Sequence, residues 1–509
     1  MMIARSATLT KESGGRATAR IRLWSLREDV LVEADPDVDR LVVINRWGET
    51  RIDDADEIVR ESLRRMSLGP ISLDNVLPPE NPGPAVTDDR RREWARLERV
   101  LDLLSGSVVH SIALYNGDGP LLSAVPIVRS ASFRLPDIDP RQPIRLSKFA
   151  AMRAVDEELL LESPLAQYQV ILHREIAARV VAAVSTATPI MELAPALKIA
   201  EPVVADIVAY LAATGIVLVG EQGPQGARFA EDEDPSLIRW SHHDLLFHSR
   251  SRMGRYGGPT GAVYPHAEVL PSPPLVKPVP KGPRFPLHRP VLPELAAEDP
   301  PLTDVIENAM LCPELSDREL TAEQIGELLY RTARIRSISP ASAGAEVTYR
   351  ISDRPYLSIY GLHELELYVS LHRCAGLPRG IYHYDPKDHV LTLINESEPE
   401  LDELLDYASV AARTTQRPPV LITIAARVAR SSWMYGGLAY SLTLTHVGAL
   451  QQTLCLVATA MGLAPCVPAI DPGDVTDSAL HLDWPAEIGV GEFIVGYRRE
   501  PGKPPYLGL

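Results

Sequence analysis

The pattern of hydrophobic and polar positions divides the first part of the chain into strands and helices. Three short runs rich in β-branched residues are predicted to be strands: 19–26, 29–34 and 40–52. A turn is expected at Trp47-Gly48, and apolar residues recur at helical spacing in 54–66 and 88–106. Further strands flank a predicted turn at Asn116-Gly117. We therefore expect a mixed α/β region over residues 1–110, followed by strand hairpins.

The period becomes helical between residues 173 and 220, where three helices and a short strand are predicted. Thr188-Pro189 precedes the second helix, and Glu201-Pro202 opens the third with proline in its first turn. Gly215 ends the third helix. Three helices and a wing indicate a winged-helix-like unit, so 111–225 is assigned to hairpins plus this unit. Its third helix contains no Lys or Arg, which disfavours binding in the major groove of DNA. The remaining roles for this unit are packing within the protein or docking of a peptide.

A proline-rich stretch, 271–290, is the clearest boundary in the chain. It contains eight prolines, so it cannot form a helix or a central strand and is expected to be an extended, semi-rigid spacer. We assign 226–300 as a linker region, with wrapping over a neighbouring surface as the alternative. Residues 301–509 mix helices and strands, which favours an α+β layer domain.

Within 301–509 the local signals are detailed. Thr321 and Gln324 form a capping-box pattern at a helix start, and a hairpin is expected around Asp385-Pro386. The stretch 363–373 reads as a helix passing into a strand. The apolar run between Gly448 and Gly462 is shorter than the roughly 20 residues of a membrane span, so a buried helix is expected. Other elements are predicted at helix 400–412 and strands 418–429 and 491–500.

Composition adds limits on function. With 509 residues, 45% of them apolar, the chain is expected to fold into about two to four domains. A net charge of −16 disfavours a general nucleic-acid binder. The four cysteines, Cys312, Cys374, Cys455 and Cys466, form no CxxC pair or zinc pattern, so reduced thiols and no metal are expected. The first residues lack the apolar stretch of a signal peptide, which predicts a cytoplasmic protein.

The region from Trp240 to Tyr497 resembles the SagB/ThcOx-type dehydrogenases, a branch of the nitroreductase-like flavoproteins that acts in azole-containing peptide natural-product pathways. Six segments in family order carry the resemblance: 240–259, 320–337, 354–369, 376–391, 433–466 and 489–497. The resemblance implies an α+β, nitroreductase-like C-terminal domain of the domain-swapped dimer type, preceded by N-terminal α/β and winged-helix-like regions. It also implies FMN as cofactor and the oxidation of thiazoline or oxazoline to thiazole or oxazole.

The resemblance also implies which residues form the site. The catalytic candidate is Tyr435. The candidate FMN contacts are Ser358, Gly361, Gly462, Leu463, Ala464 and Arg498, of which the three after the apolar helix would act mainly through backbone amides.

Several positions depart from the family pattern. Where the family has an Arg-Arg-Ser-x-Arg phosphate signature, this chain has Ala309, Met310, Leu311 and Pro313, none of which has a side-chain donor for phosphate. Met434 replaces the lysine of a Lys-Tyr pair, which leaves Tyr435, whose reference pKa lies near 10, as a poor base. Bulky or stiff residues stand where the family has small ones: Ile359, Tyr360, Pro468, Ile470 and Pro472.

Two hypotheses follow from these departures. The chain is a subunit of an FMN-dependent azoline dehydrogenase in ribosomal peptide maturation, or it is a degenerate, FMN-poor partner that scaffolds an active paralogue or binds the precursor peptide. Under both, the expected partners are a related dehydrogenase subunit in a homo- or heterodimer, a precursor peptide and a cyclodehydratase. No nucleic acid or membrane is expected. Whether the chain itself is an enzyme stays open, as do the precursor and the choice of thiazole or oxazole.

Overall fold

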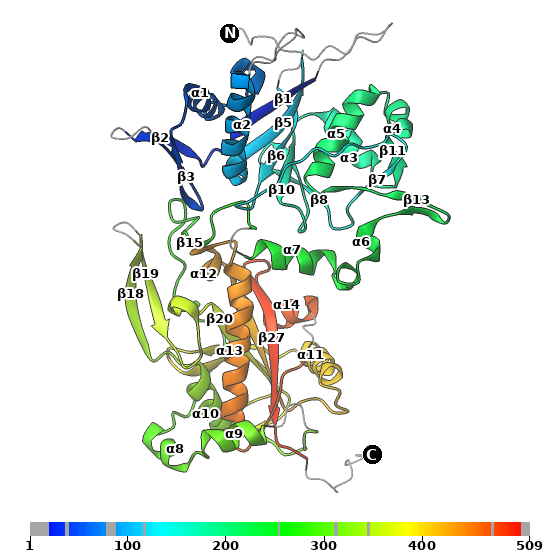
Figure 1. Ribbon diagram of the computed structural model, residues 1–509. Coiled ribbons are helices and arrows are strands. Elements are labelled where there is room, and N and C mark those ends of the chain that lie inside the picture. Colours follow the sequence, from blue (N-terminus) through cyan, green and yellow to red (C-terminus); the bar gives the residue numbers. More distant parts are fainter. Residues whose placement is uncertain are drawn as a thin grey trace. The chain divides into compact units, whose positions relative to one another are not determined.

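The computed structural model describes residues 20–35, 40–77, 88–115, 119–252, 255–309, 314–343, 347–469 and 473–499. The chain divides into two units, Met1–Pro259 (unit 1) and Thr260–Leu509 (unit 2), which are described in turn (Figure 1).

Unit 1 contains a six-stranded antiparallel sheet with the order β1-β5-β6-β10-β9-β8. Its strands are β1 (Arg20–Leu26), β5 (Val108–Leu114), β6 (Pro120–Pro126), β8 (Ala151–Val155), β9 (Glu158–Glu162) and β10 (Tyr168–Leu172). A separate meander lies between β1 and β5 in the sequence: β2 (Leu31–Asp35), β3 (Arg40–Asn45) and β4 (Gly48–Asp53). Helices α1 (Glu57–Met66) and α2 (Asp88–Leu103) share a core with both sheets through apolar residues such as Leu63 and Leu97. The predicted Asn116-Gly117 turn lies outside the described residues.

Three helices follow where the period predicted them. They are α3 (Glu175–Ala183), α4 (Ile190–Leu197) and α5 (Glu201–Ala213), with strands β7 (Pro143–Leu146), β11 (Thr188–Pro189) and β12 (Val217–Val219) forming the small sheet β11-β7-β12. A hairpin of β13 (Glu221–Gly223) and β14 (Gly226–Arg228) comes next. Proline stands in the first turn of α5, and Gly215 follows it at a φ of 78°. Assignment of these elements as a peptide-docking winged helix stays a prediction.

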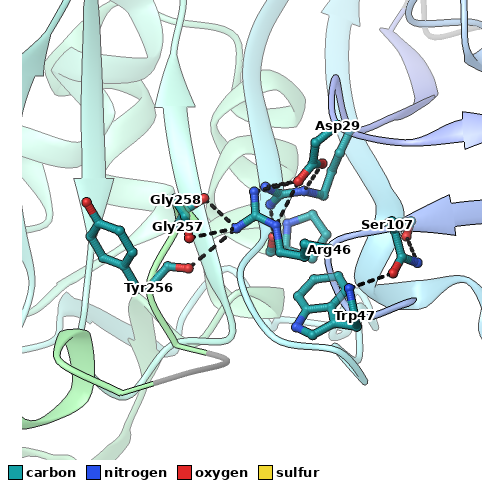
Figure 2. Close-up of polar contacts among 10 residues, drawn as sticks. Asp29, Arg46, Trp47, Ser107, Tyr256, Gly257 and Gly258 are labelled. Carbon is teal, nitrogen blue, oxygen red and sulfur yellow. Dashed lines mark hydrogen bonds and ion pairs between the residues drawn. The ribbon is translucent and has the colours of Figure 1, made fainter. Parts of the chain in front are cut away.

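The last residues of unit 1 accept hydrogen bonds from one arginine side chain. After α6 (Ala230–Glu233) and α7 (His242–Arg250), the chain reaches a Tyr-Gly-Gly stretch whose carbonyls point at Arg46 (Figure 2). The Nη1 atom of Arg46 donates to the oxygen of Gly257 at 2.6 Å, and its Nη2 atom pairs with Asp29 at 2.6 Å. A Cβ atom on Gly257 would lie 2.7 Å from Oε1 of Gln169, so a larger residue here would require the Gln169 side chain to move.

Unit 2 is built on a seven-stranded sheet with the order β16-β23-β22-β20-β24-β27-β26. The strands are β16 (Arg284–Pro286), β20 (Leu365–Leu371), β22 (Gly380–Asp385), β23 (Val390–Asn395), β24 (Val420–Arg427), β26 (Ala464–Cys466) and β27 (Glu487–Gly496). Small pairs surround it: β15 (Gly261–Ala262) with β25 (Tyr435–Gly436), β17 (Leu320–Thr321) with β21 (Cys374–Ala375), and the hairpin of β18 (Ser337–Ala343) and β19 (Val347–Asp353).

Helices cover both faces of this sheet. Helices α10 (Ala322–Ala333) and α13 (Ala439–Ala460) share one core with residues such as Leu367 and Ile422. Helices α11 (Glu398–Ala411) and α14 (Asp474–Leu480) share the other with residues such as Tyr368 and Leu421. The remaining helices are α8 (Leu292–Glu298), α9 (Leu302–Asn308) and α12 (Val428–Ser432). The capping box at the start of α10 is confirmed, because the Thr321 and Gln324 side chains each accept a hydrogen bond from the other's backbone N–H.

The prediction of a helix at the start of 363–373 is wrong. Strand β20 begins at Leu365 and no helical turn precedes it within that stretch. Both faces of β20 are covered, so Leu365 and Leu367 pack on one face while Glu366 is buried on the other against His383. Charged residues normally indicate a solvent-exposed face. A central strand that contains a buried, paired carboxylate is therefore hard to recognise as a strand from its sequence.

The proline-rich stretch belongs to unit 2 and is held by contacts with α12, with the residue after α12 and with the start of β27. The Nη1 atom of Arg430 donates to the oxygen of Pro273 at 3.0 Å, and Trp433 donates to the oxygen of Leu270 at 3.0 Å. Lys277 forms an ion pair with Glu487. Further on, Arg284–Pro286 forms the edge strand β16, as expected for proline-rich sequence that cannot occupy a sheet centre.

Two further predictions concern cysteine and membranes. Cys374 and Cys455 are free, but Cys466 is disulfide-bonded, so the expectation of reduced thiols is wrong for Cys466. Bridging depends on how close two Cα atoms come in the fold, which sequence spacing does not reveal. Among the helices in the described ranges, none, including α13, is long and apolar enough to cross a membrane.

Candidate functional site

The predicted site residues fall at the two ends of α13. Tyr435 lies just before the helix, with Ser358 and Gly361 in the loop before β20; we call this set the Tyr435 end. Gly462, Leu463, Ala464 and Arg498 lie just after it, where β26 pairs with the end of β27; we call this set the Gly462 end. The 22 residues of α13 separate the two ends by about 33 Å at 1.5 Å per residue (Figure 1). One small cofactor cannot contact both ends of the same chain.

The Tyr435 end is a closed apolar and aromatic cluster. Met434 is 1% exposed and Tyr435 5% exposed, and both pack against Leu362 and Trp433. Burial raises the pKa of the Tyr435 phenol, and neighbouring phenols such as Tyr360 raise it further. Tyr435 therefore stays protonated at neutral pH and can donate a hydrogen bond but cannot act as a base. Its Oη atom has no hydrogen-bond partner among the residues that the structure describes.

The loop before β20 is held in an unusual backbone conformation. Tyr360, Gly361 and His363 have φ values of 54°, 65° and 46°. The N–H of His363 donates to the Ser358 hydroxyl at 3.1 Å, and Arg430 donates to the oxygen of Leu362 at 2.7 Å. A strained backbone of this kind is kept only where several surrounding contacts hold it in place, and such positions are common at binding sites. Tyr360 is 68% exposed, so this loop presents an aromatic ring to solvent.

A buried Glu–His pair supports the same loop. The Glu364 carboxylate accepts from Nδ1 of His446 at 2.8 Å, and the N–H of Ile359 donates to Nε2 of His446 at 2.9 Å. Burial alone would raise the pKa of Glu364, but the hydrogen bond from His446 lowers it below its usual value. Because both ring nitrogens are engaged, His446 positions the loop and is not free to act as a base.

No sequence pattern indicates this pair. Glu364 and His446 are 82 residues apart, and neither belongs to a motif that points to the other. The only local signal is the presence of glutamates in the otherwise apolar stretch that forms β20. The second glutamate, Glu366, lies 2.8 Å from Nε of Arg427 in another buried ion pair.

The Gly462 end is more open and more basic. Gly462 has a φ of 69°, and no atom lies within 4 Å of a Cβ placed there. Arg498 is exposed, and the Arg318 guanidinium lies 3.7 Å from the ring centre of Tyr497. Gln324, at the start of α10, donates to the Tyr497 hydroxyl at 2.6 Å.

These residues fit a phosphate group at the Gly462 end in part. Arg318 and Arg498 are guanidinium donors of the kind that bind phosphate. Ala309 caps α9 and has no side-chain donor, while Met310, Leu311 and Pro313 lie outside the described residues, as do Ile470 and Pro472. In the described part of the chain, no group of three or more His, Cys, Asp or Glu side chains could hold a metal ion.

Two family models match the chain. Residues 144–257 match the family described as cyanobactin oxidase ThcOx, and residues 315–497 match the nitroreductase family. The first match covers the three-helix region of unit 1, and the second covers both ends of α13. The C-terminal part of the chain therefore has the nitroreductase-type α+β fold.

Individual relatives are distant. A protein of Methanocaldococcus jannaschii named as a nitroreductase is 28% identical over 101 residues, which are 20% of this chain and 50% of that protein. The chain thus spans about half the length of this curated relative. Among solved structures, a nitroreductase-type protein of Ralstonia eutropha is 21% identical, with a TM-score of 0.34 and coverage of 45% of this chain and 100% of that one. A chain of the E. coli microcin synthetase McbBCD complex with truncated pro-MccB17 is 18% identical, with a TM-score of 0.30 and coverage of 39% and 73%.

Proposed function

We propose that this chain, as a ThcOx-type protein with a nitroreductase domain, is a subunit of an azoline dehydrogenase that acts in ribosomal peptide maturation. The oxidation removes a proton from a ring carbon and a hydride, and turns thiazoline or oxazoline into thiazole or oxazole. FMN, when bound, supplies the hydride acceptor. The observation that carries the proposal is the pair of family matches on the two units, with the oxidase match in the first and the nitroreductase match in the second.

The chain's own residues bind the cofactor and position the substrate; they do not transfer protons. Arg318 and Arg498 would hold the phosphate, and the backbone amides of Gly462, Leu463 and Ala464 would line the pocket beside it. Tyr435 remains a neutral phenol, because burial raises its pKa, and it can orient a substrate atom by donating a hydrogen bond. Met434 has no proton to give or take, so a base for the carbon-bound proton must come from elsewhere.

We infer that the missing groups come from a second subunit. The Tyr435 end and the Gly462 end lie at opposite ends of α13, so one chain cannot complete a site with both. A second subunit packed antiparallel along α13 would place its own Gly462 end beside the first chain's Tyr435 end. The outer face of α13 supports such packing: Leu444, Gly448 and Gln452 are exposed at helical spacing, and no atom lies within 4 Å of a Cβ placed on Gly448.

A related paralogue that retains the phosphate signature and the lysine before the tyrosine would best complete the site. In such a heterodimer this chain contributes one Tyr435 end and one Gly462 end, while the paralogue supplies the base. The three-helix region of unit 1 would dock the precursor peptide, with a cyclodehydratase supplying the azoline. The absence of Lys and Arg from α5 favours a peptide over DNA.

The test is to express the chain alone, its nearest paralogue alone, and both together, and to give each an azoline-containing peptide. Mass spectrometry follows the loss of two hydrogens per oxidised ring. The proposal expects oxidation by the mixture and little by this chain alone. Full turnover by the chain alone would show that it needs no paralogue, and no stimulation of the paralogue by this chain would contradict the subunit proposal.

A further inference from the structure

A cavity of about 410 Å³ lies between the β18–β19 hairpin and the loop before β20. We call it the Arg354 pocket. The polar and charged residues that line it are Arg336, Ser337, Ser339, Ser352, Asp353, Arg354, Tyr356, Ser358 and His363. Two of these, Ser358 and His363, belong to the strained loop described above. The predicted site residue Gly361 also lines the cavity, so the pocket adjoins the Tyr435 end.

Arg354 is a buried cation whose hydrogen bonding is incomplete, although its side chain interacts with the Tyr356 phenol. It is 4% exposed, and its Nε and Nη2 atoms have no hydrogen-bond partner among the described residues. No ion pair joins Arg354 to a carboxylate in the described ranges, although Glu366 lines a small neighbouring cavity with it and has its pKa lowered in part by the Arg354 charge. The nearby carboxylates have other partners. Glu364 pairs with His446, Glu366 pairs with His383 and Arg427, and Asp353 pairs with Arg336. A buried guanidinium left without hydrogen bonds is costly, so such groups normally have a ligand, a counter-ion or water.

Other buried donors line the same pocket. The Ser352 hydroxyl is buried and has no hydrogen-bond partner among the described residues, and the same holds for Nδ1 of His363. Three guanidinium groups act on His363, while Asp353, which also lines the pocket, pairs with Arg336. The pKa of His363 is lowered to about 2, first by burial and then by positive charges that include Arg354, Arg430 and Arg336. A positive field, a guanidinium with free N–H groups and a free hydroxyl are what an oxyanion requires.

We propose that the Arg354 pocket is an oxyanion-binding site, which takes a carboxylate or a phosphate with Arg354 as the principal donor and Ser352 as a second donor. The two chemical sources are a peptide carboxylate and the phosphate of a small molecule, and both present oxygens that match a guanidinium. The site does not depend on the proposed function, because an oxyanion binds here whether or not an azoline is oxidised.

The test is calorimetric titration of the full-length chain with two pairs of probes. N-acetylglycine and its amide differ only in the carboxylate, and FMN and riboflavin differ only in the phosphate. Inorganic phosphate serves as the simplest oxyanion. We expect saturable binding of inorganic phosphate and of at least one anionic probe, and binding at least about 10-fold weaker for the neutral member of that pair, because a hydrogen bond to a charged group is lost. The pair that discriminates identifies the source of the oxyanion.

Variants separate this site from general charge effects. Arg354→Gln should weaken binding by about 10- to 100-fold, and Ser352→Ala by a few-fold, in proportion to the hydrogen bonds removed. Arg350→Gln is the matched control, because Arg350 is on the same hairpin but lines a different cavity. It should leave affinity unchanged. If Arg354→Gln does not fold, Arg354→Lys and Ser352→Ala replace it as the test of the site. Arg354→Lys keeps the positive charge but loses the planar guanidinium group that binds two oxygens at once.

A second readout is the imidazole resonance of His363 in NMR. Because His363 lines the pocket, the probe should shift this resonance with the same affinity that calorimetry gives. Absence of saturable binding, equal loss in Arg350→Gln and Arg354→Gln, or binding that leaves the His363 resonance unmoved would each overturn the proposal. So would a crystal structure grown with the probe in which only water contacts Arg354.

Discussion

Removing Glu364 tests whether the buried Glu–His pair holds the loop before β20. The carboxylate is fully buried and accepts from Nδ1 of His446 at 2.8 Å. Glu364→Leu leaves this N–H without a partner in an apolar setting. Because Nε2 of His446 accepts from the N–H of Ile359, the ring is neutral, and the contact with Glu364 is a hydrogen bond to a charged group. Losing such a bond costs about 1.5–3 kcal/mol. At about 2–4 °C per kcal/mol for a domain of this size, unit 2 should melt about 3–12 °C lower.

Differential scanning calorimetry of the full chain measures this shift, with hydrogen exchange over the loop as a local readout. The matched control is Asp406→Ala, which removes an exposed carboxylate that pairs with Arg417 and should cost less than about 1 kcal/mol. The double variant Glu364→Leu/His446→Leu should recover only part of the loss, because no polar side chain of the pair then remains unpaired but the N–H of Ile359 loses its acceptor. A single variant that melts within 2 °C (about 1 kcal/mol) of the wild type, or a double variant worse than the sum of the singles, would refute the reasoning.

Three other predictions use the same structure. Gly361→Val should destabilise unit 2 by about 1–3 kcal/mol, since Gly361 has a φ of 65° and its Cβ would lie 2.9 Å from the Ser352 oxygen; an unchanged melting temperature would contradict this. His363 has a pKa lowered to about 2 from 6.5, so the unfolded chain binds the extra proton and stability should fall as pH drops below 6.5. His363→Phe should flatten that slope, and an equal slope in the variant would contradict the assignment. Gly448→Trp should abolish any dimer formed through α13 in light scattering without lowering the melting temperature, whereas an intact dimer would exclude this face.

Local signals allowed much of the fold to be predicted. The capping box at Thr321 and the hairpin around Asp385-Pro386 depend on residues adjacent in sequence, and both are present. Strand β20 was missed at its start, because Glu364 and Glu366 pair with residues far along the chain. The disulfide at Cys466 was missed for the same reason: it depends on distance in the fold.

The candidate site was predictable in its parts but not in its arrangement. Tyr435 and Gly462 each stand in a recognisable segment, yet nothing in either segment shows that α13 holds them about 33 Å apart. The Arg354 pocket also has no sequence signal, since Ser352, Arg354 and His363 become a site only when the β18–β19 hairpin and the loop before β20 pack together.

The central claim is that this chain completes a dehydrogenase site only with a second, more complete subunit. The most direct measurement is bound flavin per chain, from absorbance after purification of the chain alone and of its complex with the paralogue. On the proposal that residues 309–313 replace a phosphate signature, two or three charge-assisted hydrogen bonds are missing, which should weaken FMN binding by about two to six orders of magnitude. We therefore expect little flavin on the chain alone and near-stoichiometric flavin on the complex. Stoichiometric FMN on the chain alone would contradict the claim and support an ordinary dehydrogenase homodimer.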